Sequence, residues 1–168
     1  MHTIAKRASS LIICFTLFLS SIAWAQQSAN VLYNQKYGFT ASYPSGWTIL
    51  DDYGGTAIMF LESESNANVN VVAEDVPVTS LSEYVELNVN HLTNDGFKVA
   101  SREDIDAYRV RVVYQYQADN RELMIATDYY VVSQRGFHVT GTWAVGDPES
   151  VVDSINQVMS SFVVTETQ

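Results

Sequence analysis

The chain has 168 residues, with 9 basic against 19 acidic side chains and a formal net charge of −10. A charge of this sign and size excludes binding through a broad basic surface, so we expect neither nucleic acid nor anionic lipid as a partner. The length suits a single hydrophobic core.

Residues 1–25 predict a cleavable export signal. Lys6 and Arg7 supply a positive start, and the segment from Leu11 to Ile22 is mostly apolar. Ala23-Trp24-Ala25 then places small residues at the −3 and −1 positions before the cleavage point. The apolar stretch is shorter than the roughly 20 residues that span a bilayer. We therefore expect no stable membrane anchor after cleavage, and a mature protein that is periplasmic or secreted.

Cleavage would also change the chemistry of the chain. It removes Cys14, the one cysteine, so the mature protein would have neither a disulfide nor a thiolate nucleophile. Cys14 follows Ile13, where a lipobox requires a small residue, which argues against a lipid anchor. The net charge falls from −10 to −12, because Lys6 and Arg7 are lost and no acid is.

The mature sequence predicts a flexible leader over residues 26–36 and a single domain over 37–165. Strands are expected where apolar residues alternate with polar ones, and a two-residue period is typical of a half-buried strand. The expected strands are 38–43, 47–50, 56–61, 68–75, 97–101, 107–118, 122–133, 137–144 and 162–165. Residues 134–136 are a short connection that makes the last two long strands an antiparallel hairpin.

Two helices interrupt these strands. Ser80-Leu81-Ser82-Glu83 matches a capping box, and Asn94-Asp95-Gly96 provides the C-terminal stop. The second helix is expected to open at Asp147-Pro148, with the aspartate as N-cap and the proline in the first turn. The order of four strands, a helix, four strands and a helix predicts an α+β fold, with helices packed on an antiparallel sheet.

No catalytic motif stands out. The sequence has no G-x-S-x-G nucleophile elbow, and His91 and His138 are the histidines that remain after cleavage. We interpret both as surface or hydrogen-bonded histidines. We therefore expect a protein that is not an enzyme and that carries no cofactor.

An acidic cluster raises the possibility of a metal site. Glu103, Asp104 and Asp106 are expected in the turn before a long strand, and oxygen-rich loops suit calcium, magnesium or manganese. The alternative is that these are ordinary turn residues of an acidic protein. The spaced ligands and bend glycine of a calcium loop are missing.

A second candidate site is a ligand-binding face. Arg109 and Arg111 alternate with apolar residues, so they project from the opposite side of their strand, and Asp128 and His138 join them if the register allows. A pair of arginines can bind a carboxylate or a phosphate. The alternative is a set of cross-strand salt bridges, with Asp128 as the partner.

Residues 37–47 (YGFTASYPSGW) resemble the opening signature of PsbP-like domains, a Y-G-F-x-x-x-Y-P-x-x-W pattern on the first β-hairpin. The later order, with Ser80 to Tyr84 opening a helix and long strands before a final helix, is also similar to that family. The resemblance covers roughly residues 33–165. It implies an antiparallel sheet between helices, an α/β/α sandwich.

The resemblance also implies a class of function. Members of the family act largely as binding or assembly modules, and many are bacterial exported proteins. We therefore expect a non-catalytic protein with a protein partner in the cell envelope. The alternative is a protein that binds a small ligand or a divalent cation.

Overall fold

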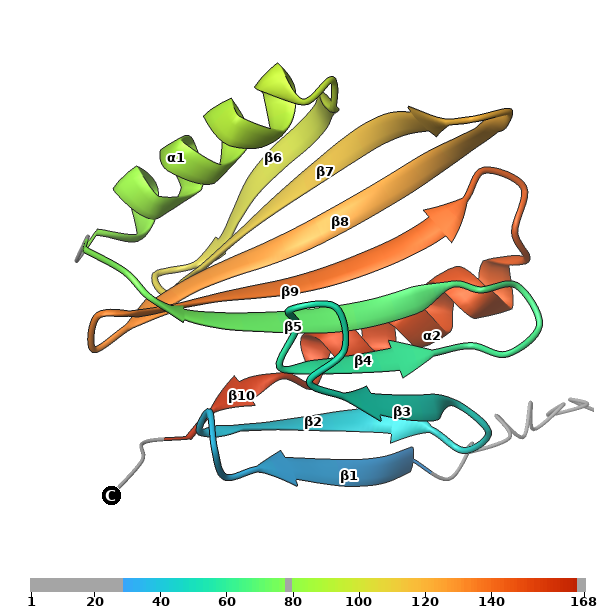
Figure 1. Ribbon diagram of the computed structural model, residues 1–168, viewed down its shortest axis with the longest axis horizontal. Coiled ribbons are helices and arrows are strands. Elements are labelled where there is room, and N and C mark those ends of the chain that lie inside the picture. The colour runs from blue at the N-terminus through green and yellow to red at the C-terminus, as the bar shows by residue number, and fades with distance from the viewer. Residues whose placement is uncertain (1–28, 78–79, 166–168) are drawn as a thin grey trace, which may run out of the picture.

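The computed structural model describes residues 29–77 and 80–165, which form two antiparallel sheets and two helices (Figure 1). The strands, in chain order, are β1 (Ala29–Asn34), β2 (Phe39–Pro44), β3 (Thr48–Asp51), β4 (Ile58–Leu61), β5 (Asn68–Asp75), β6 (Lys98–Asp106), β7 (Arg109–Ala118), β8 (Arg121–Val132), β9 (Arg135–Ala144) and β10 (Val163–Val164). The helices are α1 (Leu81–Asn94) and α2 (Glu149–Ser160).

The larger sheet has the order β3-β4-β5-β9-β8-β7-β6, and the smaller sheet has the order β1-β2-β10. Helix α2 packs on one face of the large sheet against β5 and β9, and it also contacts β2 of the small sheet. Helix α1 packs on the opposite face against β6, β7 and β8 (Figure 1). The expected α+β architecture, an antiparallel sheet between helices, is confirmed.

Two hydrophobic cores follow from these two faces. The larger core lies between α2, the small sheet and the large sheet, where Phe39 of β2 meets Phe137 of β9 edge-on at 6.5 Å between ring centroids. The smaller core lies beneath α1 and includes Tyr84 and Val85 of the helix with Tyr114 and Tyr129 of the sheet. Successive residues of a strand point to opposite faces of the sheet, so neighbouring residues contribute to different cores.

Helix α1 begins as its sequence predicts. Ser80 is the N-cap, and its Oγ accepts a hydrogen bond from the Glu83 backbone N–H at 3.4 Å. The start of α2 differs, because Pro148 is the N-cap. Asp147 accepts a hydrogen bond from the backbone N–H of Ala144 at 2.8 Å, so its carboxylate turns back toward β9 instead of capping the helix.

The expected flexible leader is wrong over residues 29–34, because these form β1. The strand pairs along its whole length with β2, from Ala29 opposite Pro44 to Asn34 opposite Phe39. Leu32 packs against the larger core, while Val31 and Tyr33 face outward. The proposed signal peptide, residues 1–25, lies outside the described residues.

A second correction concerns β6, which is longer than the expected strand of residues 97–101. It continues to Asp106 along the outer edge of the sheet, with a register irregularity between Asp104 and Asp106. Tyr108 then lies in the β6–β7 turn and is exposed. Among the described residues, no helix is long and apolar enough to cross a membrane.

Candidate functional site

The predicted ligand face divides between the two sides of the large sheet. Residues that pair across neighbouring strands share a face, and Arg111 pairs with Asp128, which pairs with Val139. This places Arg109, Arg111 and Asp128 on the side of α2. His138 pairs with Tyr129 and therefore lies on the side of α1.

Arg109 and Arg111 both lie close to a carboxylate within the fold, that of Asp128. Arg111 donates from Nε to Asp128 Oδ1 at 2.6 Å and from Nη2 to Asp128 Oδ2 at 2.8 Å. Arg109 Nη1 lies 4.0 Å from the same carboxylate, which is fully buried. The hydrogen bonds to Asp128 raise the pKa of Arg111. An external anion would have to displace a buried carboxylate, so the geometry favours the salt-bridge alternative.

The acidic residues do not gather into a metal site. Glu103 and Asp104 lie within β6 and Asp106 ends it, instead of crowding a turn. Glu103 stands opposite Arg111 in the register, and Asp106 lies 3.5 Å from Arg109 Nε. In the described part of the chain, no group of three or more His, Cys, Asp or Glu residues is placed to hold a metal ion.

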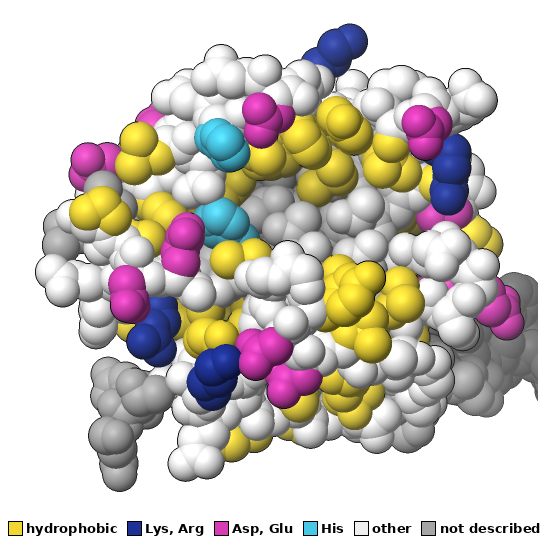
Figure 2. Space-filling view, viewed as in Figure 1, with side chains coloured by type: hydrophobic (Ala, Val, Ile, Leu, Met, Phe, Trp, Pro, Cys, Tyr) yellow, Lys and Arg dark blue, Asp and Glu magenta, His cyan; other side chains and the backbone are white. Residues whose placement is uncertain are grey.

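A cleft opens on the α1 face, where the helix leaves part of the sheet uncovered. The strands β5 and β9 are covered by α2 on one face, where Val69, Val71 and Val139 are buried. Their residues on the opposite face, Asn70 and Thr140 among them, are partly exposed. Figure 2 shows this hollow, with hydrophobic side chains along one wall.

We call this cavity the α1 cleft; its volume is about 370 Å³, within the range of ligand pockets. Its polar lining consists of amide, hydroxyl and imidazole side chains: Asn70, Asn88, His91, Thr127, Tyr129, His138, Thr140 and Thr142. Its apolar lining consists of Val72, Leu92, Phe97 and Ile125. The floor comes from β5, β9 and β8, and one wall comes from the last turns of α1.

His138 is a largely buried titratable group of the α1 cleft. Its ring lies between Tyr129 and Tyr84, at centroid distances of 5.0 and 5.2 Å. Its Nε2 is buried without a hydrogen-bond partner and lies 3.7 Å from Glu74 Oε1. Burial lowers the pKa of His138, and the Glu74 carboxylate offsets part of that effect. The imidazole is therefore neutral at pH 7.

Hydrogen bonds between side chains fix the region around His138. Tyr84 of α1 donates its hydroxyl to Glu74 Oε1 at 2.7 Å. The hydroxyls of Tyr114 and Tyr129 lie 2.9 Å apart, and those of Thr127 and Thr140 lie 3.1 Å apart. Burial raises the pKa values of Tyr84 and Tyr129, so both phenols stay protonated. The side chains of Tyr84, Tyr129 and His138 are therefore uncharged and held by neighbouring groups, and no nucleophile is paired to a base among the described lining residues.

Comparison with protein-family models and with curated protein sequences gives no match. The solution structure of cyanobacterial PsbP (CyanoP) from Synechocystis sp. PCC 6803 is similar, with a TM-score of 0.59 at 19% identity, covering 84% of this chain and 95% of that one. The chain has a PsbP-like fold.

Two further structures share the PsbP-like fold. LpqN, involved in cell envelope biogenesis of Mycobacterium tuberculosis, has a TM-score of 0.59 at 12% identity, covering 83% of this chain and 91% of its own. A crystal structure from Bacteroides thetaiotaomicron VPI-5482 has a TM-score of 0.59 at 14% identity, covering 83% of this chain and 49% of that one. At these identities the likeness shows the fold alone.

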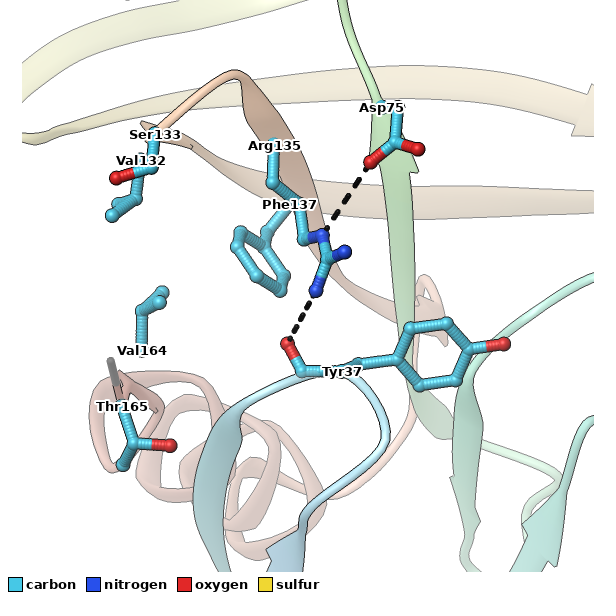
Figure 3. A pocket seen from close by; sticks show the side chains of 8 residues that line it. All are labelled: Tyr37, Asp75, Val132, Ser133, Arg135, Phe137, Val164 and Thr165. Carbon is cyan, nitrogen blue, oxygen red and sulfur yellow. Dashed lines mark hydrogen bonds and ion pairs between the residues drawn. The ribbon is translucent and has the colours of Figure 1, made fainter. Parts of the chain in front are cut away.

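The protein has a second cavity, of about 300 Å³, where the β8–β9 turn meets the small sheet (Figure 3). Arg135 lies across it, with Nε 3.7 Å from Asp75 Oδ1 and Nη1 donating to the Tyr37 carbonyl at 3.4 Å. Because these contacts tie the large sheet to the β1–β2 turn, we assign Arg135 a structural role. The α1 cleft is therefore the better candidate site.

Sequence reasoning missed the α1 cleft because its lining comes from separate strands. Asn70, Thr127 and Thr140 each look like ordinary outward-facing strand residues, and pairing alone brings them together. A signal was nevertheless present, because these alternate positions carry hydroxyls and amides where an acidic protein would be expected to carry some carboxylates.

Proposed function

We propose that this protein is a non-catalytic binding module of the cell envelope and that the α1 cleft is its binding site. The observation that supports the proposal is an open cavity on the half of the sheet that α1 leaves bare, lined by hydroxyl, amide and imidazole groups and by no Asp, Glu, Lys or Arg among the described residues. The export signal predicted over residues 1–25 and the likeness to LpqN, a protein involved in cell envelope biogenesis, support the location.

Our leading hypothesis for the bound molecule is a protein of the envelope, which would insert an uncharged loop or side chain into the α1 cleft. A photo-crosslinking residue at His91, an exposed position on the rim, tests this in the native envelope. The matched control is the same residue at Asp153, an exposed position of α2 on the other side of the sheet.

We expect a discrete crosslinked product from position 91 that is absent from position 153. Equal labelling from both positions would contradict the proposed site. The second candidate function is a small-ligand binding protein, favoured by the volume and the polar floor of the α1 cleft. Because a ligand stabilises the state that binds it, a rise in thermal midpoint with added ligand identifies this alternative.

A further inference from the structure

We propose that the α1 cleft binds a neutral saccharide. This inference rests on the second candidate function, a small-ligand binding protein, and names the chemical class of that ligand. The chain has 28 charged Asp, Glu, Lys and Arg residues, yet none of these four types is among the described residues that line the cleft. The nearby carboxylate of Glu74 is already bonded to the Tyr84 hydroxyl.

The absence of charge restricts the ligand. A charged ligand would lose hydration on entering the cleft without gaining a group of opposite charge. A purely apolar ligand would leave the floor hydroxyls and amides without partners. A ligand that is uncharged and rich in hydroxyl groups meets both conditions.

The polar groups are placed to serve such a ligand. The Thr127 and Thr140 hydroxyls bond to each other, and Asn88 Nδ2 donates to the Tyr84 carbonyl at 2.9 Å. Asn70 and Thr142, by contrast, are partly exposed residues of the cavity floor. Their amide and hydroxyl groups offer both donors and acceptors, so sugar hydroxyls can replace the water that they otherwise bind.

The apolar wall fits the other side of a sugar ring. Leu92 of α1 and the neighbouring Phe97 line the side of the cleft, and Ile125 of β8 lies beside Thr142 at the floor. The Phe97 ring is held in place by Tyr116, which stacks on it with a centroid distance of 4.3 Å and an interplanar angle of 16°. The C–H face of a pyranose can pack on such a wall while its hydroxyls reach the floor.

The backbone argues against an extended peptide as the occupant. The three floor strands, β5, β9 and β8, each pair with a neighbour on both sides. The cleft therefore offers no free strand edge to which a peptide could add by backbone hydrogen bonds. Recognition has to come from side-chain hydroxyls, amides and rings, which favours the saccharide.

The test is an NMR titration of the purified isotope-labelled protein with four neutral probes: maltotetraose, cellotetraose, mannotetraose and chitotetraose. A galacturonate tetramer serves as the charged comparison. We expect at least one neutral probe to give saturable shifts in amides of β5, β8, β9 and the end of α1, and the charged tetramer to bind at least tenfold more weakly.

Variants locate the site. Thr142→Val and Asn70→Val should each weaken the binding of that probe at least tenfold. Thr40→Val, a matched change on partly exposed β2 outside the cleft, should leave binding unchanged. Unperturbed amide spectra of the free variants confirm that each one folds. Binding that Thr142→Val and Asn70→Val both leave unchanged would overturn the proposal.

The remaining outcomes separate this inference from the proposed function. If no neutral probe gives saturable shifts at millimolar concentration, the saccharide proposal fails, while a specific protein crosslink at position 91 would still support the binding function. Where a probe binds, co-sedimentation with the insoluble polymer of the same sugar distinguishes a polysaccharide from a soluble oligosaccharide as the source.

Discussion

Arg111 and Asp128 form a two-point ion pair across β7 and β8, with both carboxylate oxygens bonded to one guanidinium at 2.6 and 2.8 Å. The pair lies beneath α2, where Arg111 Nη1 also donates to Asn156 Oδ1 at 3.5 Å. The Asp128 carboxylate is therefore the main counter-charge of Arg111, whereas Arg109 lies closer to Asp106, at 3.5 Å, than to Asp128, at 4.0 Å.

Replacing Asp128 should strongly lower the free energy of unfolding. Asp128→Ala leaves the half-buried Arg111 without its counter-charge, and breaking a buried pair from one side costs about 3–5 kcal/mol. Urea denaturation gives the loss directly. The control, Asp153→Ala at an exposed site of α2, should change stability by less than about 0.5 kcal/mol. A loss at Asp128 no greater than at Asp153 would contradict the structural role.

His138 should make stability depend on pH. Its folded pKa lies below the ordinary value of 6.5, because burial outweighs the nearby Glu74, and its other close neighbours are the phenols of Tyr84 and Tyr129. The unfolded chain therefore binds more protons, so this contribution is complete above pH 6.5 and is lost as the pH falls below it.

The measurement is the urea midpoint between pH 5 and 8 for the wild type, His138→Gln and His91→Gln. We expect the fall below pH 6.5 to be shallower in His138→Gln. His91→Gln should follow the wild type, because the His91 side chain is 76% exposed. Parallel curves for wild type and His138→Gln would show that His138 is not the group responsible.

Gly141 of β9 lies against α2 with no room for a side chain. A Cβ at this position would collide with Ile155 Cγ2 and would lie 2.8 Å from Met159 Sδ, both on α2. Gly141→Ala should therefore destabilise the fold by about 1–3 kcal/mol. The double variant Gly141→Ala/Ile155→Ala should lose less unfolding free energy than the two single variants lose together, because the shortened Ile155 side chain makes room for the new Cβ. Strict additivity in a thermal or urea cycle would rule out this contact.

The pairing of β1 predicts opposite results for two adjacent residues. Leu32 packs inward, so Leu32→Ala should lower the free energy of unfolding by about 1–2 kcal/mol, less than for a fully buried leucine. Val31 is 71% exposed, and Val31→Ala should change it by less than about 0.5 kcal/mol. If both changes are equally silent in urea denaturation, residues 29–34 do not behave as a strand in solution.

The parts of the fold that sequence could predict are those governed by local chemistry. The alternation of Val69 and Val71 fixed one buried face of β5, and Ser80 fixed the start of α1. Strand β1 was not predicted, because its inward Leu32 is flanked by outward-facing and polar residues that give no clear alternation. Strand β6 was cut short because Glu103 and Asp104 look like turn residues, although an exposed edge strand tolerates charge.

The site depended on pairing that no local pattern specifies. Whether His138 joins Arg111 or Tyr129 is decided by the register of β8 against β9, and a shift of one residue would reverse the answer. The cross-strand partnership of Arg111 and Asp128 was predicted as one of two alternatives, because opposite charges on neighbouring strands are common. The α1 cleft could not be predicted, because its lining residues come from separate elements that only the folded structure brings together.

The order of strands in the large sheet has a consequence for how the chain reaches its native state. Strand β5 pairs with β9, so Asp75 stands opposite Arg135, sixty residues later, with α1, β6, β7 and β8 lying between them in sequence. Strands β6 to β9 can pair in sequence across short turns, whereas the pairing of β5 with β9 requires a long loop to close, at a larger cost in chain entropy. Val69 and Val71, which are buried in the folded protein, lack their β9 partners until that pairing forms. We therefore expect aggregation to compete with folding while β5 and β9 are still unpaired, because unpaired strand edges and exposed apolar residues favour association between chains.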